Sequence, residues 1–326
     1  MTHKFNEEKM AFDQSARLRA QDVLKPLSLR LANEREEWSK ERPATLYHYT
    51  NAAGLLGIVG SNRLWATHTA YLNDRMEIKY AADLIAAEIR ERLAKAVSEP
   101  TRELLTRMSV TYDFSDMGIS AYVACLCEKG DLLSQWRSYG AQGAGFALGM
   151  RTRFIGMHGV PQDEPNFSLR RVIYSEARQR AIVSKYFDEF IELFEETLIS
   201  LGEGGRESLI PQFCAAFRNA AVELMITFKH PAFEQEHEWR FIFLHWIGSD
   251  DGLESVKFRP SANFLVPYVE IDISTQVGAG ANRLPLVKVI VGPTGDPALS
   301  VASTRMLLRK NNFAHADVAV SGVPLR

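Results

Sequence analysis

The segment EQEHEWRFIFL, at residues 234–244, carries the densest set of side chains that could do chemistry. Its aromatic and β-branched content predicts a strand, in which Glu236, Glu238 and Arg240 share one face. Two carboxylates at alternate positions of a half-buried strand repel each other unless Arg240 or a ligand compensates their charge. Such a cost is typical of functional sites, although a surface ladder of ion pairs would also explain the pattern.

An imidazole and a hydroxyl lie close together in the segment Tyr47-His48-Tyr49-Thr50. Alternation along a strand turns His48 and Thr50 toward one face and the two tyrosines toward the other. His48 can then hydrogen-bond to a ligand. A structural histidine at the end of a strand is the alternative interpretation.

Two more clusters offer aromatic rings for stacking. The segment SQWRSY at 134–139 combines the cation of Arg137 with the ring of Tyr139, which suits an aromatic, phosphorylated ligand. An ordinary buried aromatic turn would explain it equally. The motif N-D-x-x-E at 73–77 is followed one helical turn later by Tyr80. Helix capping explains the two acidic residues of this motif without any ligand.

Several other chemistries lack their sequence patterns. The glycines of YGAQGAGFALG lead into a strand, whereas a dinucleotide fingerprint opens a helix, so they predict a turn. His230, His237 and His245 follow no HExxH spacing, and the chain has no CxxC pair. The G-x-S-x-G motif of many hydrolases is also missing. We therefore expect no catalytic metal and no serine hydrolase.

Composition indicates a folded, water-soluble protein. Apolar residues make up 46% and charged residues 24% of the 326-residue chain, which excludes disordered and collagen-like classes. The formal charge of −2 gives no basic excess for sequence-independent binding of nucleic acid. Three cysteines are too few for a disulfide framework, and no signal peptide or membrane-spanning run is visible. We expect a cytoplasmic location and no membrane partner.

The order of the predicted elements indicates an α+β fold with a mixed, mainly antiparallel sheet. Strand candidates are grouped and helices arrive in blocks, so the regular alternation of α/β proteins is absent. We expect a helical arm over residues 1–42 and a single domain over 43–326, with a helical insertion at about 180–229. Ten strands are predicted, in LYHYT, RLWAT, GISAYVACLCE, GAGFALGM, LRRVIYS, HEWRFIFL, ESVKFRP, FLVPYVEI, LVKVIVGP and FAHADVAVS.

Three groups of motifs carry a resemblance to known families. In order, they are LYHYT to LNDRMEIKY, then CLCEKGDLLSQWRSYGAQGAGFALGM, then FKHPAFEQEHEWRFIF. Over about residues 45–245 they resemble a bacterial family known only as domain of unknown function 2971. The opening strand, short helix and second strand are also similar to ADP-ribosyltransferase-like folds. In those folds a strand-borne His followed by Thr or Ser holds NAD, and a Glu on a later strand is catalytic.

This resemblance implies an enzyme that cleaves NAD and transfers ADP-ribose to an acceptor protein, to nucleic acid or to water, without a metal. The resemblance also implies a role for each candidate residue. Glu238 stabilises the ribose in the transition state, and Glu236 positions the acceptor or the second ribose. His48 and Thr50 hold the adenosine-side ribose, Tyr80 or Tyr139 stacks on nicotinamide, and Arg137 or Arg240 binds the pyrophosphate. For one site to form, the fold must bring the strands of His48 and Glu238 together in one sheet.

Two other classes remain open. The first is a non-catalytic sensor that binds a nucleotide or nucleic acid in the same pocket, in a bacterial stress or phage-defence setting. The second is a nuclease, since acidic clusters that bind Mg²⁺ cut phosphodiesters. Dependence on a metal would separate the nuclease from the NAD-cleaving enzyme.

Overall fold

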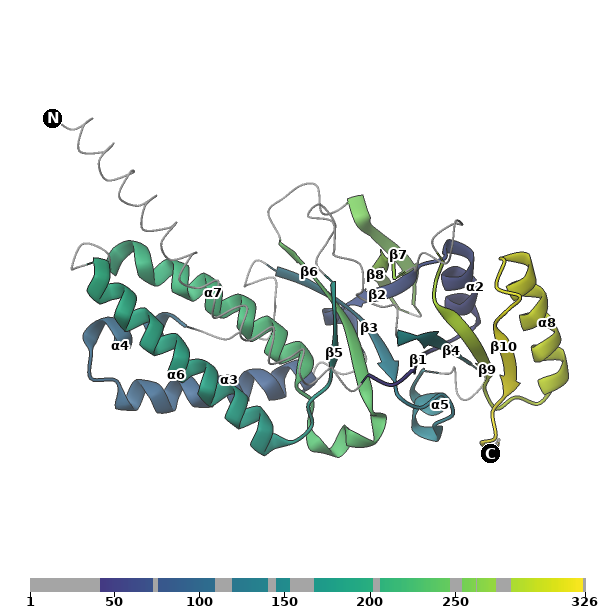
Figure 1. The fold of residues 1–326 in the computed structure, drawn as a ribbon, viewed down its shortest axis with the longest axis horizontal. Helices are drawn as coiled ribbons and strands as arrows, with labels where there is room; N and C mark the ends of the chain where they lie inside the picture. The colour runs from purple at the N-terminus through teal and green to yellow at the C-terminus, as the bar shows by residue number, and fades with distance from the viewer. Residues whose placement is uncertain are drawn as a thin grey trace. The chain divides into compact units, whose positions relative to one another are not determined.

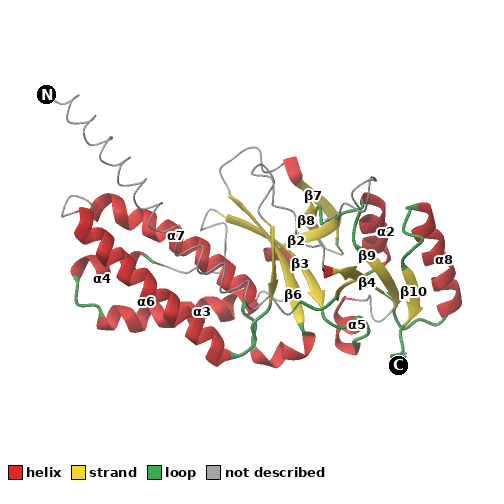
Figure 2. Ribbon diagram, viewed as in Figure 1, coloured by secondary structure: helices red, strands yellow, loops and turns green. Residues whose placement is uncertain are grey.

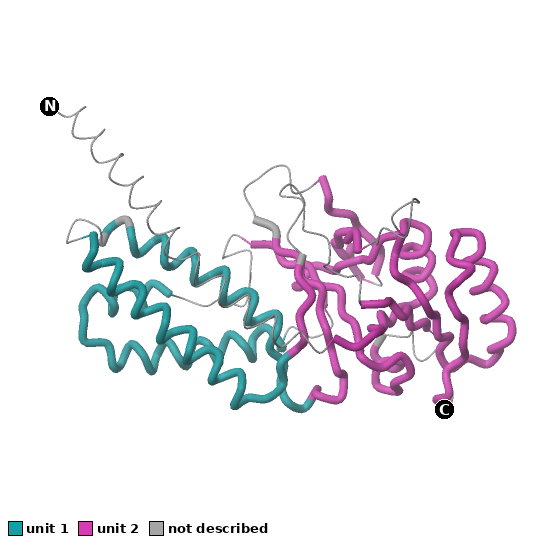
Figure 3. The backbone as a smooth tube through the Cα atoms, viewed as in Figure 1, with its two compact units in different colours: residues 1–38, 74–117, 173–232 teal, residues 39–73, 118–172, 233–326 magenta. Residues whose placement is uncertain are grey.

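The computed structural model describes residues 42–72, 76–108, 119–139, 145–152, 167–201, 206–246, 254–261, 263–273 and 283–324. The arm predicted at 1–42 lies outside these residues apart from Arg42, and so do Asn73, Asp74, Gly140 and Gly143. The chain divides into two compact units, each built from separate segments (Figure 3). The helical unit comprises residues 1–38, 74–117 and 173–232, and the sheet unit comprises 39–73, 118–172 and 233–326.

Helices make up the described part of the helical unit (Figure 1). They are α3 (Met76–Lys95), α4 (Glu99–Arg107), α6 (Glu176–Leu201) and α7 (Arg206–Thr227). The core between α6 and α7 is aromatic, because phenylalanines recur at helical spacing on both. Phe190 of α6 lies 5.1 Å from Phe213 of α7 between ring centroids, and Phe187 lies 5.7 Å from Phe217. The insertion predicted at about 180–229 thus consists of α6 and α7, which pack with α3 and α4.

The described part of the sheet unit contains one ten-stranded sheet, in which only β9 and β10 pair in parallel (Figure 2). Its strands are β1 (Thr45–Thr50), β2 (Leu64–His68), β3 (Ile119–Cys127), β4 (Phe146–Arg151), β5 (Phe167–Arg171), β6 (Glu238–Trp246), β7 (Val256–Pro260), β8 (Leu265–Ile271), β9 (Leu286–Val291) and β10 (Asp317–Val320). The order is β10-β9-β4-β1-β3-β2-β8-β7, with β6 paired to β3 and β5 to β6. The predicted α+β class and mainly antiparallel sheet are confirmed.

Helices cover both faces of this sheet. On one face α2 (Ala52–Ser61) and α8 (Pro297–Lys310) pack on a core that includes Leu46 and Leu148. On the other face α5 (Leu133–Tyr139) places Trp136 against Tyr49. Because neighbouring residues of a strand face opposite sides, β1 contributes side chains to both cores.

The sheet branches at β3. One edge of β3 pairs with β6 along its whole length. The other edge pairs with β2 at Val123, opposite Thr67, and with β1 at Cys127, opposite Tyr47. Cys125 lies between these two contacts. We call this position the open edge of β3.

Candidate functional site

His48 reaches the open edge of β3. Its Nδ1 lies 2.8 Å from the carbonyl oxygen of Cys125. A carbonyl oxygen only accepts, so Nδ1 carries the proton and donates it, and Nε2 keeps its lone pair in the neutral ring. Burial lowers the pKa of His48, and the positive charge of Arg259 lowers it further, whereas the bond to Cys125 acts in the opposite direction. The half-buried ring is therefore a neutral imidazole with one nitrogen ready to accept a hydrogen bond.

Thr50 lies on the same face of β1 as His48, as predicted from strand alternation. The first turn of α2 covers it: a Cβ added to Gly54 would lie 1.9 Å from the hydroxyl oxygen of Thr50. Asn51 caps this helix by accepting a hydrogen bond from the backbone N–H of Gly54, at 2.9 Å. Only a glycine allows α2 to begin so close to the strand.

Glu238 and Arg240 form a buried ion pair on β6. Arg240 Nε donates to Glu238 Oε1 at 2.8 Å, and Nη2 donates to Oε2 at 2.9 Å. The exposed fractions of the two residues are only 4% and 3%. The predicted compensation of Glu238 by Arg240 is thus present, in the two-pronged geometry that favours an ionised carboxylate. The pair is buried instead of lying in a surface ladder.

The strands of His48 and Glu238 belong to one sheet, with β3 between them. Tyr47, Cys127 and Glu238 lie side by side across β1, β3 and β6. Residues paired in this way share a face, so Glu238 lies on the face of Tyr47. His48, the next residue along β1, faces the opposite side. The two predicted motifs meet in one sheet, and alternation starts their side chains from opposite faces.

The predicted position of Glu236 is wrong. Residues Pro231–Glu236 form a 3₁₀ helix, and His237 has a left-handed backbone with a φ of 45°. The strand therefore begins only at Glu238, and alternation cannot place Glu236 on the face of Glu238 and Arg240. A hydrogen bond from a distant part of the sequence holds this turn, because the thiol of Cys127 donates to the carbonyl oxygen of Glu236 at 3.1 Å.

Sequence reasoning missed Glu128, directly after β3. Its carboxylate accepts the indole N–H of Trp239 at 2.8 Å and lies 3.2 Å from Arg171 Nη2. Its backbone N–H donates to the carbonyl oxygen of His237 at 3.1 Å. Glu128 thus fixes the start of β6, which carries Glu238. An acidic residue at the end of an apolar strand was the only signal for it.

The cluster around α5 is mainly structural. Trp136 is fully buried, stands edge-on to Tyr49 with 4.7 Å between ring centroids, and donates its indole N–H to Asp131 at 2.7 Å. The alternative of a buried aromatic turn therefore describes Trp136. Arg137 is exposed, and Tyr139 ends the helix with a side chain outside the described part.

Tyr80 belongs to the helical unit. Its hydroxyl donates to the side-chain oxygen of Gln179 at 2.7 Å, and its ring lies 5.2 Å from that of His230. Gln179 in turn donates to the carbonyl oxygen of Lys229 at 2.9 Å. The Lys229 side chain lies 2.6 Å from Glu77, so Glu77 forms an ion pair there. Sequence analysis missed Lys229, which stands between Phe228 and His230 without a distinctive motif.

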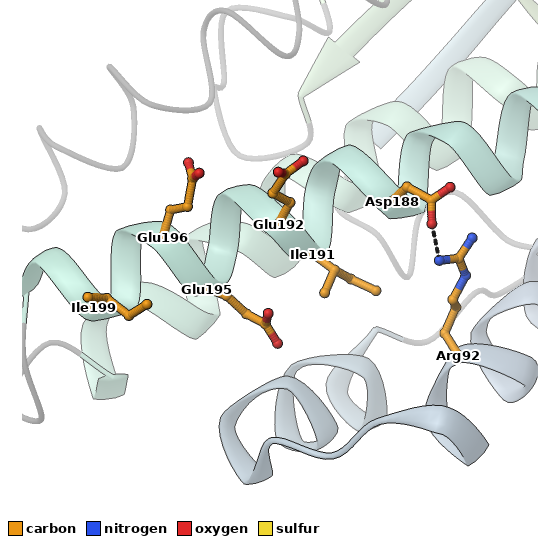
Figure 4. A pocket seen from close by; sticks show the side chains of 7 residues that line it. All are labelled: Arg92, Asp188, Ile191, Glu192, Glu195, Glu196 and Ile199. Carbon is orange, nitrogen blue, oxygen red and sulfur yellow. Dashed lines mark hydrogen bonds and ion pairs between the residues drawn. The ribbon is translucent and has the colours of Figure 1, made fainter.

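An acidic groove in the helical unit was not predicted either. It has a volume of about 390 Å³ and is lined by Arg92 of α3 and by residues of α6 (Figure 4). Arg92 forms ion pairs with Asp188 and Glu88. The other lining residues are Ile191, Glu192, Glu195, Glu196 and Ile199.

Residues 135–241 match a family described as protein of unknown function (DUF2971). This match supports the resemblance to that family over the segment from α5 to the start of β6. No curated protein and no solved structure matches the chain. Within the described residues, no helix is both long and apolar enough to span a membrane.

Proposed function

We propose that this protein binds a dinucleotide such as NAD, with a ribose hydroxyl hydrogen-bonded to His48. The observation that carries this proposal is the state of the His48 ring. Its Nδ1 proton is committed to Cys125, and no residue of the described part hydrogen-bonds to Nε2. A neutral imidazole nitrogen accepts a hydrogen bond from a hydroxyl, and a ribose offers two adjacent hydroxyls.

The similarity to ADP-ribosyltransferase-like folds makes NAD the first ligand to test. In those folds the equivalent histidine holds NAD, and His48 is followed here by Thr50 on the same face. Binding without turnover would make the protein a nucleotide-binding sensor, the alternative function predicted from the sequence. The described fold is compatible with both roles.

NAD cleavage is a second candidate function, favoured by the ion pair of Glu238 and Arg240. The bond between ribose C1′ and the nicotinamide nitrogen breaks, and its electron pair leaves with nicotinamide. Positive charge develops on the ribose before water or an acceptor hydroxyl adds to C1′ and loses its proton. A carboxylate beside the ribose stabilises that charge in the transition state. Two hydrogen bonds from Arg240 hold the Glu238 carboxylate in one orientation.

The two candidates rest on different residues, so they can be tested separately. His48 donates to the carbonyl oxygen of Cys125 at the open edge of β3, whereas the Glu238–Arg240 pair lies on the face of Tyr47 and Cys127. Loss of His48 should therefore weaken binding, whatever happens to turnover.

Calorimetric titration of the full chain with NAD tests the binding proposal. We expect His48→Ala to weaken NAD binding by about tenfold, the effect of one lost hydrogen bond of roughly 1.5 kcal/mol. His315→Ala is the matched control, because His315 also bonds to a backbone carbonyl oxygen, that of Leu286 at 3.1 Å. It should leave binding unchanged. Absence of NAD binding by the wild type, or equal affinity in His48→Ala, would contradict the proposal.

A further inference from the structure

Arg259, on the edge strand β7, is a half-buried cation with no counter-charge among the described residues. Its Nη2 donates to the hydroxyl oxygen of Thr67 at 2.9 Å, and its Nε is shielded from solvent without a hydrogen-bond partner. No carboxylate in the described part of the chain forms an ion pair with it. Burial without a partner also lowers the pKa of this guanidinium.

Lys257, a second cation of β7, differs from Arg259 in having a counter-charge. It lies two residues earlier on β7 and on the same face, but its ammonium lies 2.8 Å from the carboxylate of Glu270. Lys257 is also exposed, so water solvates its charge. One face of β7 therefore carries one compensated cation and one uncompensated cation. The uncompensated cation is the more buried of the two.

A second donor without an acceptor lies on the same face. Trp65 Nε1 is shielded from solvent, and no residue in the described ranges accepts a hydrogen bond from it. The ring is held in place, since it packs on Tyr268 with 4.6 Å between centroids and leaves no room for a Cβ at Gly57. Pairing of β2 with β8 and of β8 with β7 puts Trp65 on the face of Thr67 and Arg259. A buried donor without an acceptor destabilises the folded chain.

His48 lies within electrostatic reach of this face. The charge of Arg259 is one of the causes that lower the pKa of His48. Thr67, which receives the Arg259 hydrogen bond, is paired with Val123 of β3, two residues before Cys125. Arg259 bonds to Thr67 on the face of Cys127 and Glu238, and the His48 ring reaches the carbonyl oxygen of Cys125, so the two side chains approach the open edge of β3 from opposite faces of the sheet.

We infer that Arg259, assisted by the indole N–H of Trp65, binds a phosphoryl group of the nucleotide whose ribose is held by His48. An anion supplies the missing counter-charge and accepts the hydrogen bonds that no residue accepts. A guanidinium matches phosphate oxygens with its planar fork of N–H groups. The inference rests on the proposed function and assigns the phosphate end of the ligand to β7.

The test compares a nucleoside with its diphosphate. Affinities of adenosine and ADP are measured by calorimetry on the full chain, and their ratio isolates the contribution of the phosphates. We expect the wild type to bind ADP at least tenfold more tightly than adenosine, since hydrogen bonds to charged groups contribute about 1.5–3 kcal/mol. Arg259→Met should bring the ratio close to one without changing the affinity for adenosine. Trp65→Phe, which removes only the N–H donor, should lower the ratio by a few fold.

Two further variants serve as controls. Lys257→Met removes the neighbouring compensated cation and should keep the wild-type ratio. Arg259→Lys keeps the positive charge but lacks the planar guanidinium, so it should keep part of the preference for ADP over adenosine. This variant also provides a test if Arg259→Met does not fold. An unchanged ratio in folded Arg259→Met would overturn the inference and leave the proposed function standing.

Binding of inorganic pyrophosphate distinguishes a failure of the proposed function from a failure of the phosphate site. If neither adenosine nor ADP binds to the wild type, the proposed function fails. A rise in Tm with pyrophosphate that disappears in Arg259→Met would still support the phosphate site. No rise in the wild type would then overturn the phosphate site as well.

Discussion

Lys229 and Glu77 form an ion pair inside the helical unit, with 2.6 Å between Nζ and Oε1. The exposed fractions of their side chains are only 2% and 11%. Glu77 lies in the first turn of α3, and Lys229 follows the end of α7. The pair therefore joins two helices that are distant in the sequence, and it does so where water cannot replace a lost partner.

We predict that Lys229→Met lowers the free energy of unfolding by about 3–5 kcal/mol, because it leaves Glu77 charged and buried. Urea denaturation followed by circular dichroism measures the change. The double variant Lys229→Met with Glu77→Leu should recover most of the loss. Lys79→Met is the control, since the ion pair of Lys79 with Asp83 is exposed and should contribute less than about 1 kcal/mol. Equal losses in both single variants would contradict the prediction.

A second prediction concerns NAD cleavage. Glu238→Gln keeps the size of the side chain but removes the charge that would stabilise the ribose. Nicotinamide release should fall by roughly 10²–10⁴, equivalent to about 3–5 kcal/mol of transition-state stabilisation. Glu236→Gln should leave turnover unchanged, because Glu236 lies before the strand. Thermal melts must show that both variants are folded. Full activity in Glu238→Gln would exclude this mechanism.

A third prediction follows from the lowered pKa of His48. The unfolded chain binds a proton at this histidine near pH 6.5, whereas the folded protein holds the ring neutral to lower pH. The unfolded state then binds more protons, so stability falls as pH drops below about 6.5 toward the folded-state pKa. Tm should fall between about pH 7 and 5 in the wild type, and by less in His48→Asn. Identical pH profiles of the two proteins would refute the assignment.

A fourth prediction compares two glycines of α2, Gly57 and Gly60. In Gly57→Ala the new Cβ would lie 2.0 Å from the ring of Trp65, so the ring or the helix must move. We expect a loss of about 1–3 kcal/mol in unfolding free energy. Gly60→Ala is the matched control, because no heavy atom lies within 4 Å of its Cβ. In that variant the better helix propensity should stabilise the protein by up to about 1 kcal/mol. Chemical denaturation of both variants checks the difference in sign.

Periodicity predicted the elements of the fold because their burial is set by local patterns. On β6, alternation placed Trp239 and Phe241 in one core and Arg240 on the opposite face, as the structure has them. The helical insertion expected at about 180–229 likewise corresponds to α6 and α7. The α+β class then followed from the grouping of strands and helices.

Long-range pairing was beyond such reasoning. The left-handed backbone at His237, which excludes Glu236 from β6, depends on contacts with Cys127 and Glu128, which are distant in the sequence. The capping pattern at Glu77 is local, whereas its partner Lys229 comes from another helix. Arg259 stood in a predicted strand, but its missing counter-charge appears only when its neighbours are known.

The pairing of β3 with β6 has a consequence for synthesis on the ribosome. About 110 residues separate the paired Cys127 and Glu238, and they include both long helices α6 and α7. At typical elongation rates, roughly 5–20 s pass between the emergence of the two strands. During that interval the apolar β3 has a free edge of the kind that recruits other chains. Nascent chains of this protein should therefore depend on chaperones until β6 has emerged.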